Sequence, residues 1–335
     1  MLQWAEASDD LMTGTHLTSV IPGEFTGMRV DQAASRLFTD FSRTTLKGWI
    51  LDGKLLVNHR RVKPREILRG GEAVDLWPSA EPRVESQPQP IALTVIHEDD
   101  DLIVIDKPAG LVVHPGAGNR AGTLLNALLH FDPGLALLPR AGIVHRLDKE
   151  TSGLLVIARS PRAHTYLVKE LKARRIAREY DAVVRGVLIA GGSVSAPLGR
   201  HPVQRTRMAV VAGGREAVTH YRVVRRFRAH THLRLRLETG RTHQLRVHMA
   251  HLRMPIVGDP VYGGRLLLPP GATPVLARTL QGFKRQALHA SRLRLLHPAT
   301  GHELEWQSPL PPDMTLLLEV LSEDARGLHS GARPP

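Results

Sequence analysis

A polar turn between two apolar runs holds the residues best suited to chemistry in this chain. The runs are Ile143-Val144 and 154–158, and the second, which is short and branched, is predicted to be a buried strand. Leu147 interrupts the charges, so Arg146 and Asp148 would point the same way in an extended segment. A solvated hairpin loop is the alternative, although loops on strand scaffolds commonly carry function. The polar residues of the turn are His145, Arg146, Asp148, Lys149, Glu150, Thr151 and Ser152.

A single loop carboxylate such as Asp148 can act as a nucleophile or a base without metal or cofactor. Other catalytic classes fit less well. A protein kinase needs the order His-Arg-Asp with Gly-rich and Asp-Phe-Gly segments, and a serine hydrolase needs a Gly-x-Ser-x-Gly elbow. A magnesium nuclease would need converging carboxylates, for which only 99–101 is a candidate, and that run is predicted to be a turn. The glycines at 116–122 lack the spacing of a nucleotide-binding loop.

The stretch 238–251 contains a second group of basic side chains. It follows an alternating strand, 233–237, with one apolar and one basic face. Thr242 is predicted to cap a helix over 243–250, which carries Arg246 in its first turns. Three histidines suggest a metal site, but they do not share a helix face, and no carboxylate or cysteine completes the set: His243, His248 and His251. We therefore expect no metal.

Tyr180 opens another predicted strand, after a helix over 163–171. Core packing is the ordinary role of a strand tyrosine. The arginines and lysines on either side of Tyr180 favour an RNA-facing role equally, and the loop 201–207 is basic enough to contact phosphates.

The composition favours a globular protein with a polyanionic partner. The chain has 335 residues, 42% hydrophobic and 23% charged, and its net charge of +13 points to nucleic acid before membrane. An arginine-rich lineage bias is the alternative. The chain has no cysteine, no signal peptide is recognised, and no apolar stretch is long enough to span a bilayer. We expect a cytoplasmic protein.

The elements that must position these residues fall into two predicted domains. Residues 1–15 are predicted to be a disordered extension, 16–77 a first domain, 78–90 a proline-rich linker, 91–323 a second domain and 324–335 a disordered tail. The first domain is predicted to hold a strand over 16–25, a helix at 30–37, a helix capped by Ser42, and strands at 55–57 and 73–76. Its basic residues are Arg43, Lys47, Lys54, Arg60 and Arg61. The second domain is predicted to continue with a strand at 102–105, a helix capped by Thr123, strands at 288–296 and 303–306, and a helix at 314–321.

Two resemblances follow from the motifs. Arg29-Val-Asp-Gln32 and Leu55-Leu-Val-Asn58 resemble the S4-type RNA-binding domain. The stretch 141–159, with His145-Arg-Leu-Asp148, resembles the signature of the RluA-type pseudouridine synthases. The likeness runs from about His16 to Glu323 and also includes these motifs: Arg178-Glu-Tyr180, Glu238-Thr-Gly-Arg-Thr-His-Gln-Leu-Arg246 and Gly258-Asp-Pro-Val-Tyr-Gly-Gly264.

This resemblance implies an α+β fold, in which a small S4-like domain precedes a catalytic domain built on a mixed, mainly antiparallel sheet flanked by helices and loops. It implies isomerisation of uridine to pseudouridine in 23S rRNA or a precursor of the large ribosomal subunit, within helix 69. No cofactor and no membrane partner are expected, and the protein is expected to be a monomer.

The same resemblance assigns roles to site residues. Asp148 would be essential, either attacking the ribose or taking a proton from it. Tyr180 would stack on the uracil and help remove its C5 proton. Arg246, ahead of Arg241, would pair with Asp148, and Arg146 would fill the space left by the flipped base. The alternative functions are a non-catalytic RNA-binding or ribosome-assembly factor that kept the fold, and a metal-dependent nuclease.

Overall fold

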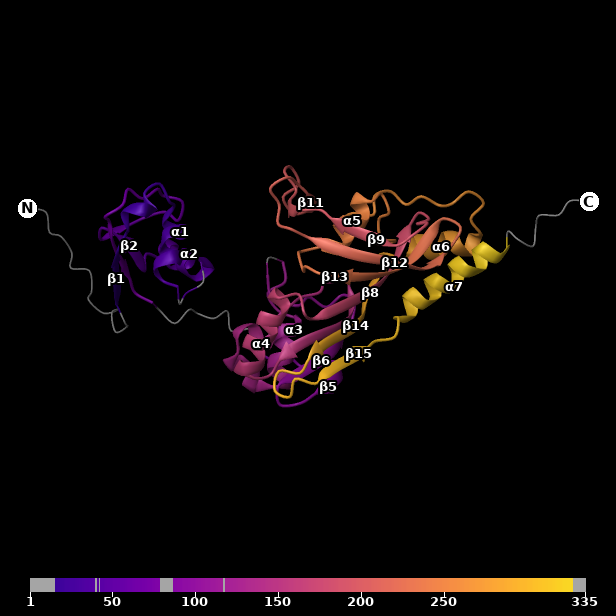
Figure 1. Cartoon of the computed structure of the whole chain (residues 1–335), viewed down its shortest axis with the longest axis horizontal. Helices are drawn as coiled ribbons and strands as arrows, with labels where there is room; N and C mark the ends of the chain where they lie inside the picture. Colours follow the sequence, from indigo (N-terminus) through magenta and orange to yellow (C-terminus); the bar gives the residue numbers. More distant parts are fainter. Residues whose placement is uncertain (1–15, 40, 42, 79–86, 117, 328–335) are drawn as a thin grey trace, which may run out of the picture. The chain divides into compact units, whose positions relative to one another are not determined.

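The structure is a computed structural model of the chain, and it describes residues 16–39, 41, 43–78, 87–116 and 118–327 (Figure 1). It separates into two compact units, divided between residues 85 and 86. The predictions for 1–15, for the Ser42 cap and for 328–335 fall outside the described residues.

The first unit is a small antiparallel sheet with two helices. Leu46, Trp49 and Ile50, on the second helix, are among its buried core residues, as the spacing predicts. The first strand ends at Val20, earlier than predicted, because Pro22 and a 3-10 turn follow it. The elements are β1 Leu17–Val20, α1 Val30–Leu37, α2 Arg43–Asp52, β2 Leu55–Val57, β3 Arg60–Arg61 and β4 Ala73–Leu76, with the strand order β1-β4-β2-β3.

The second unit is built on a nine-stranded sheet in the described part of the chain, in the order β5-β6-β7-β14-β8-β13-β12-β9, with β15 paired to β14. The pair β7–β14 is parallel and the other pairs are antiparallel, so the predicted mixed, mainly antiparallel sheet is confirmed. The elements that lead to β8 are β5 Thr94–Glu98, β6 Leu102–Lys107, α3 Leu124–Phe131, β7 Ser152–Ala158 and α4 Pro161–Lys172. From β8 onwards they are β8 Ala177–Arg185, β9 Gly192–Ser195, β10 Leu198–Arg200, β11 Met208–Val210, β12 Val218–Arg226, β13 His230–Leu237, α5 Gln244–His251, α6 Pro274–Gly282, β14 Leu288–Leu296, β15 Glu303–Gln307 and α7 Pro312–Gly327.

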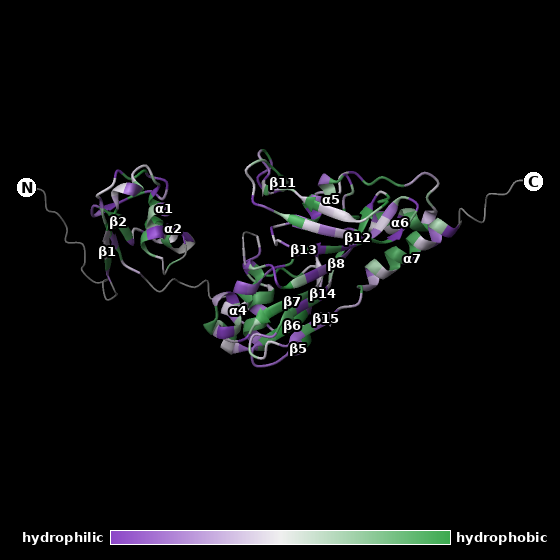
Figure 2. Ribbon diagram, viewed as in Figure 1, coloured by the Kyte–Doolittle hydropathy of each residue, from purple (hydrophilic) through white to green (hydrophobic). Residues whose placement is uncertain are grey.

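Strand β7, which leaves the polar turn, is buried along all seven residues. Leu155 and Ile157 face the main core, and Leu154 and Val156 face a second core that includes Leu167 of α4. Because both faces are covered, β7 is continuously apolar from Leu154 to Ala158 rather than alternating, as is most of β6 (Figure 2). The polar turn is therefore attached at its C-terminal end to a strand that is buried along its whole length.

Two predicted boundaries are wrong. Gln87 and Gln89 belong to the second unit, because the Asn126 side chain donates to the Gln87 carbonyl (2.9 Å) and the Gln89 amide donates to the Asn126 carbonyl (3.0 Å). The predicted linker, 78–90, is therefore too long. At the other end α7 continues to Gly327, and Asp324 is buried, accepting bonds from Arg228 Nε (2.9 Å) and the Thr273 amide (3.2 Å). The polar composition of this segment predicted a disordered tail. The prediction failed because the partners that bury Asp324 are distant in sequence.

Truncation after Glu323 tests the corrected boundary. It removes Asp324 and leaves Arg228 without its carboxylate, so the free energy of unfolding should fall by about 2 kcal/mol in urea titrations. Truncation after Gly327 is the control and should leave stability unchanged, since it removes no described contact. Equal stability of the two truncated chains would contradict a structural role for Asp324.

Candidate active site

The polar turn at 145–151 is fixed by a buried lysine. Lys107, at the end of β6, is fully buried, and its ammonium donates to the carbonyls of Pro108 (2.7 Å), Leu111 (3.1 Å) and Lys149 (3.0 Å). The Gly110 amide also donates to the Lys149 carbonyl (2.9 Å). Burial lowers the pKa of Lys107 to about 8. These bonds hold the backbone directly after Asp148.

A second anchor comes from the segment before β14. Gln286 Nε2 donates to the Thr151 hydroxyl (3.0 Å), and the Thr151 amide donates to the Asp148 carbonyl (3.0 Å). Further along, β7 approaches β14 so closely that a Cβ on Gly153 would lie 2.3 Å from the Ala290 carbonyl oxygen. Only glycine fits there, and the close approach fixes where the turn ends.

His145 is structural. Its Nε2 accepts a bond from the Val156 amide (3.2 Å), so the ring is neutral with its proton on Nδ1, which is buried and has no partner among the described residues. Burial, with a smaller contribution from Arg178, lowers the pKa of His145 to about 3. His145 therefore supports the start of β7 rather than offering a free ring to a substrate.

Helix α5 starts where a buried glutamine fixes the loop before it. Gln244 Oε1 accepts from the Thr239 hydroxyl (2.8 Å) and the Arg241 amide (3.0 Å), and Nε2 donates to the Val218 carbonyl (3.0 Å). His243 precedes the helix with a φ of 56°, in the left-handed region, and makes no side-chain cap bond. The predicted cap at Thr242 is therefore wrong, because Gln244 replaces it as the residue that fixes the loop.

His248, another histidine of this stretch, is engaged within the core through both ring nitrogens. His248 is fully buried, and its two ring nitrogens contact the Thr219 hydroxyl (2.9 Å) and the Ala196 carbonyl (3.1 Å). Within the described ranges, no three His, Cys, Asp or Glu side chains group closely enough to hold a metal ion.

The centre of the site is an arginine held between two carboxylates. Arg246 Nη1 donates to Asp148 Oδ2 (2.9 Å), and its Nε and Nη2 donate to the two oxygens of Asp259 (2.7 and 2.9 Å). The Asp259 side chain is fully buried and also accepts from the amides of Val261 (2.8 Å) and Tyr262 (2.9 Å). Burial alone would lower the pKa of Arg246, but Asp259 and then Asp148 raise it above its usual value. The guanidinium is therefore a fixed cation beside Asp148.

Tyr262 and His243 complete this cluster. The Tyr262 hydroxyl accepts from the Met208 amide (3.0 Å) and lies 2.8 Å from His243 Nδ1, while the Arg246 guanidinium lies 5.1 Å from the tyrosine ring centre. His243 Nε2 lies 3.9 Å from Asp148 Oδ1. Burial is the main cause that lowers the pKa of His243, so its ring adds little positive charge at neutral pH.

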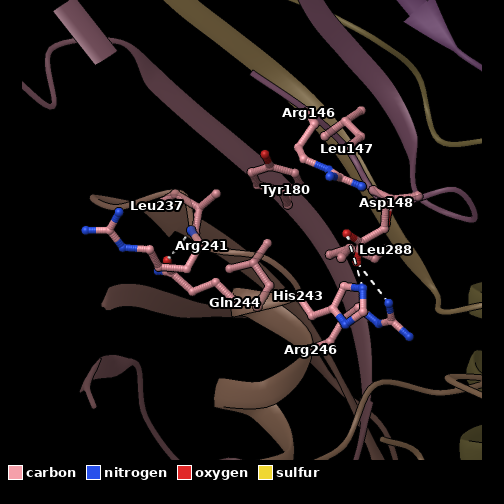
Figure 3. A pocket seen from close by; sticks show the side chains of 12 residues that line it. Arg146, Leu147, Asp148, Tyr180, Leu237, Arg241, His243, Gln244, Arg246 and Leu288 are labelled. Atoms are coloured by element: carbon pink, nitrogen blue, oxygen red, sulfur yellow. Dashed lines mark hydrogen bonds and ion pairs between the residues drawn. The ribbon is translucent and has the colours of Figure 1, made fainter. Parts of the chain in front are cut away.

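A pocket opens over Asp148 and Tyr180, and Figure 3 shows Asp148 joined to Arg246 and His243 on one side of it. Tyr180 is buried, its hydroxyl has no hydrogen-bond partner among the described residues, and burial raises its pKa. Asp148 is the single acid of the lining, beside several cations and an aromatic side chain. The lining residues are Arg146, Leu147, Asp148, Thr151, Tyr180, Leu237, Arg241, His243, Gln244, Leu245, Arg246 and Leu288.

The structure thus brings together five residues singled out in the sequence: Asp148, Tyr180, Arg246, Arg146 and Arg241. Arg246, rather than Arg241, contacts Asp148; Arg241 Nε donates to the Glu216 carbonyl (3.1 Å). The sequence reasoning missed Lys107, Asp259, Tyr262 and Gln286 as site residues. Asp259 and Tyr262 lie in the motif Gly258–Gly264, to which the resemblance assigned no role.

The basic residues chosen in the first unit are not part of this pocket. Arg43 pairs with Asp31 (2.7 Å) and Arg60 pairs with Glu66. Lys47 and Arg61 are exposed, and Lys54 is partly buried. Arg43 and Arg60 are thus already engaged in ion pairs inside their own unit.

Comparison with known proteins decides the family. Residues 101–251 match the family model described as RNA pseudouridylate synthase, and residues 28–74 match that of the S4 domain. A relative from Pseudomonas aeruginosa, named ribosomal large subunit pseudouridine synthase D, is 55% identical over 91% of this chain and 95% of its own. The chain belongs to the RNA pseudouridylate synthase family. As a pseudouridine synthase it is an isomerase, so the enzyme class, the S4 domain and the fold class expected from the sequence are confirmed.

Further relatives agree with this assignment. A Xanthomonas campestris protein that also carries the name synthase D is 53% identical over 96% of this chain and 97% of its own. Among solved structures, human RNA pseudouridylate synthase domain containing 4 superimposes with a TM-score of 0.53 at 27% identity, covering 68% of this chain and 93% of that chain.

Asp259→Asn tests the arrangement around Arg246. Replacing one carboxylate oxygen by an amide breaks part of the paired hydrogen bonds to Arg246, so the guanidinium should no longer hold Asp148 in place. We expect the turnover rate for pseudouridine formation to fall about 10- to 100-fold while RNA affinity stays within about twofold. Glu170→Gln is the matched control, because Glu170 makes the same paired contact with Arg175 far from the pocket. Equal rates for both variants would contradict a positioning role for Asp259.

The buried neutral His145 predicts acid sensitivity. The unfolded chain takes up a proton at His145 below a pH of about 6.5, whereas the folded chain does so only near pH 3, so stability falls as the pH drops through this window. At pH 5 this costs about 2 kcal/mol relative to pH 7.5. In urea titrations at both pH values, His145→Gln should reduce the loss of stability by about that amount. An unchanged loss would show that His145 does not account for it.

Proposed function

We propose that this protein isomerises uridine to pseudouridine in the 23S rRNA of the large ribosomal subunit, at uridines of helix 69, with Asp148 as the catalytic carboxylate. The observation that carries the proposal is that Asp148 is the single acid among the pocket residues and is held by Arg246 at 2.9 Å. The relatives named for the large ribosomal subunit, the S4 domain and the net charge of +13 support rRNA as the substrate.

The electrostatics around Asp148 suit a reaction at the ribose. Asp259 engages two nitrogens of Arg246, which leaves Nη1 to fix one oxygen of Asp148, while the other oxygen remains available to substrate. Asp148 either attacks C1′ or removes a proton from the ribose. In both routes the bond between C1′ and N1 breaks, the uracil rotates, and a bond between C1′ and C5 forms. N1 ends with a proton and C5 loses one, so the product is an isomer and no cofactor is consumed.

The walls of the pocket suit an extruded uracil. Taking a base out of an RNA stack costs roughly a few kcal/mol. The ring of Tyr180 offers a stacking face, and Leu237 and Leu288 add apolar contacts. Arg146 is exposed at the pocket and carries no carboxylate partner in the described chain, so it is suited to occupy the place of the flipped base. Together these contacts offset the cost of flipping.

The S4 domain would bring RNA to the pocket through sequence-independent phosphate contacts. Lys47, Arg61 and Lys54 are the residues we propose for those contacts, with Arg43 and Arg60 contributing from their ion pairs. We further propose that the protein works in the cytoplasm as a monomer, since one chain supplies every residue that lines the pocket. Among the described residues, no helix is long and apolar enough to cross a membrane.

Incubation with a helix 69 stem-loop, followed by mapping of pseudouridine, tests the proposal. Wild-type protein should convert uridines in the loop, and Asp148→Asn should lower the rate about a thousandfold or more while RNA binding persists. Asp132→Asn is the matched control, because Asp132 also pairs with an arginine and its side chain is 19% exposed against 17% for Asp148.

Other outcomes would identify a different function. RNA bound by the wild type without any pseudouridine would indicate a ribosome-assembly factor that kept the fold. Strand cleavage abolished by a chelator would indicate a nuclease. Full activity of Asp148→Asn would refute the mechanism proposed for the carboxylate.

A further inference from the structure

Arg178 is a largely buried residue with no counter-ion among the described residues. It lies on β8, and the residue is 8% exposed. In the part of the chain that the structure describes, it makes no ion pair or hydrogen bond, and its Nε is buried without a partner. Other arginines of the unit with low exposure are paired, as Arg246 is with Asp148 and Asp259, and Arg285 with Asp313. A buried nitrogen without a hydrogen-bond partner costs stability, so the position of Arg178 is not explained by the stability of the fold.

The strand places Arg178 on the side of the pocket. Alternate residues of a strand face the same way, so Arg178 shares its face of β8 with Tyr180, two residues on. The intervening Glu179 faces the opposite side, where it lies 3.5 Å from Arg234. The charge of Arg178 also reaches both neighbours in the site, lowering the pKa of His145 beyond the effect of burial and opposing the rise at Tyr180.

The loop between β13 and α5 is shaped to leave room for this guanidinium. A Cβ on Gly240 would lie 3.0 Å from Arg178 Nη1. Gly240 is exposed and has no left-handed backbone angle, so a side chain there would crowd the guanidinium of Arg178 without straining the backbone. Nε is the one nitrogen of Arg178 that is both enclosed and unpartnered. The two terminal nitrogens therefore reach solvent beneath Gly240, beside the pocket residue Arg241.

We propose that Arg178 binds a phosphodiester next to the target uridine. This rests on the proposed function, which supplies RNA as the ligand. The described residues offer no anion for Arg178, since Asp148 is the single acid of the pocket lining and is already paired with Arg246. A guanidinium fork matches two phosphate oxygens, and the missing counter-ion then arrives with the substrate. Because Arg178 and Tyr180 share one strand, their Cα atoms are held roughly 7 Å apart, which fixes the phosphate contact relative to the stacking face.

Salt dependence of binding gives the first test. Affinity for the helix 69 stem-loop is measured by filter binding between low and high salt, for the wild type and for Arg178→Met. Loss of one phosphate contact should weaken binding about tenfold and reduce the slope of log affinity against log salt by about 0.7 to 0.9. Arg294→Met is the control, since it removes one exposed charge paired with Glu303 on the opposite face of the sheet. It should change neither quantity by as much.

Thermal unfolding separates this role from a structural one. A phosphate-binding Arg178 predicts that the melting temperature of Arg178→Met, without RNA, equals or exceeds that of the wild type. A fall in melting temperature together with an unchanged salt slope would overturn the proposal.

A modified RNA locates the phosphate. A neutral methylphosphonate replaces, in turn, the phosphate on each side of the target uridine. The wild type should lose about tenfold in affinity for one of the two RNAs, and Arg178→Met should lose nothing further on that RNA. Gly240→Ala keeps every charge but crowds Nη1, so it should weaken binding of the unmodified RNA and not of that methylphosphonate RNA. Full, additive losses for Arg178→Met at both positions would refute the contact.

These measurements can still be interpreted if the protein does not isomerise uridine in this RNA. Wild-type protein that binds the stem-loop but forms no pseudouridine would refute the isomerase proposal for this RNA. The salt slope and the methylphosphonate effect depend on binding alone, and would still support or overturn the phosphate contact.

Discussion

Everything at the pocket depends on one buried guanidinium shared by two carboxylates. Removing an arginine and two aspartates from water is expensive, and the cost is offset only where the geometry satisfies each of them. Here Asp259 accepts hydrogen bonds from two nitrogens of Arg246 and from two backbone amides. Asp148 accepts a hydrogen bond from the remaining nitrogen of Arg246. The arrangement is asymmetric: Asp259 is fully enclosed, whereas Asp148 keeps one side towards the pocket. The position of Asp148 and the positive charge beside it are thereby set before any substrate arrives.

The three members of this cluster come from distant parts of the chain, so the fold must deliver each one accurately. Asp148 lies in a turn held by Lys107 and Gln286, and Arg246 lies on a helix whose start is fixed by Gln244. In each case a buried side chain bonds to the backbone or to a neighbouring hydroxyl rather than to Asp148 or Arg246 itself. Such bonds restrict the loops while leaving the functional atoms unoccupied.

Local patterns predicted much of this fold and part of the site. The apolar run before Arg159 predicted β7, Thr123 predicted the start of α3, where it forms a reciprocal cap with Asn126, and a motif pointed to Asp148. The errors arose where a distant partner decides the outcome. Gln244 replaced Thr242 at the start of α5 through bonds to β12 and to the loop after β13, and Asp324 is buried by its contact with Arg228. Asp259 stood in a motif already noticed, but nothing near it in sequence shows that it supports Arg246.

The setting of Lys107 has a consequence for the conditions in which the site can work. Three backbone carbonyls converge on its ammonium, in the way that carbonyl oxygens converge on a metal ion in other proteins. Here the cation is covalently part of the chain, so it cannot be lost by dilution or exchanged for another ion. The geometry of the turn is therefore independent of the ions that RNA itself requires to fold, and the protein and its substrate do not compete for them.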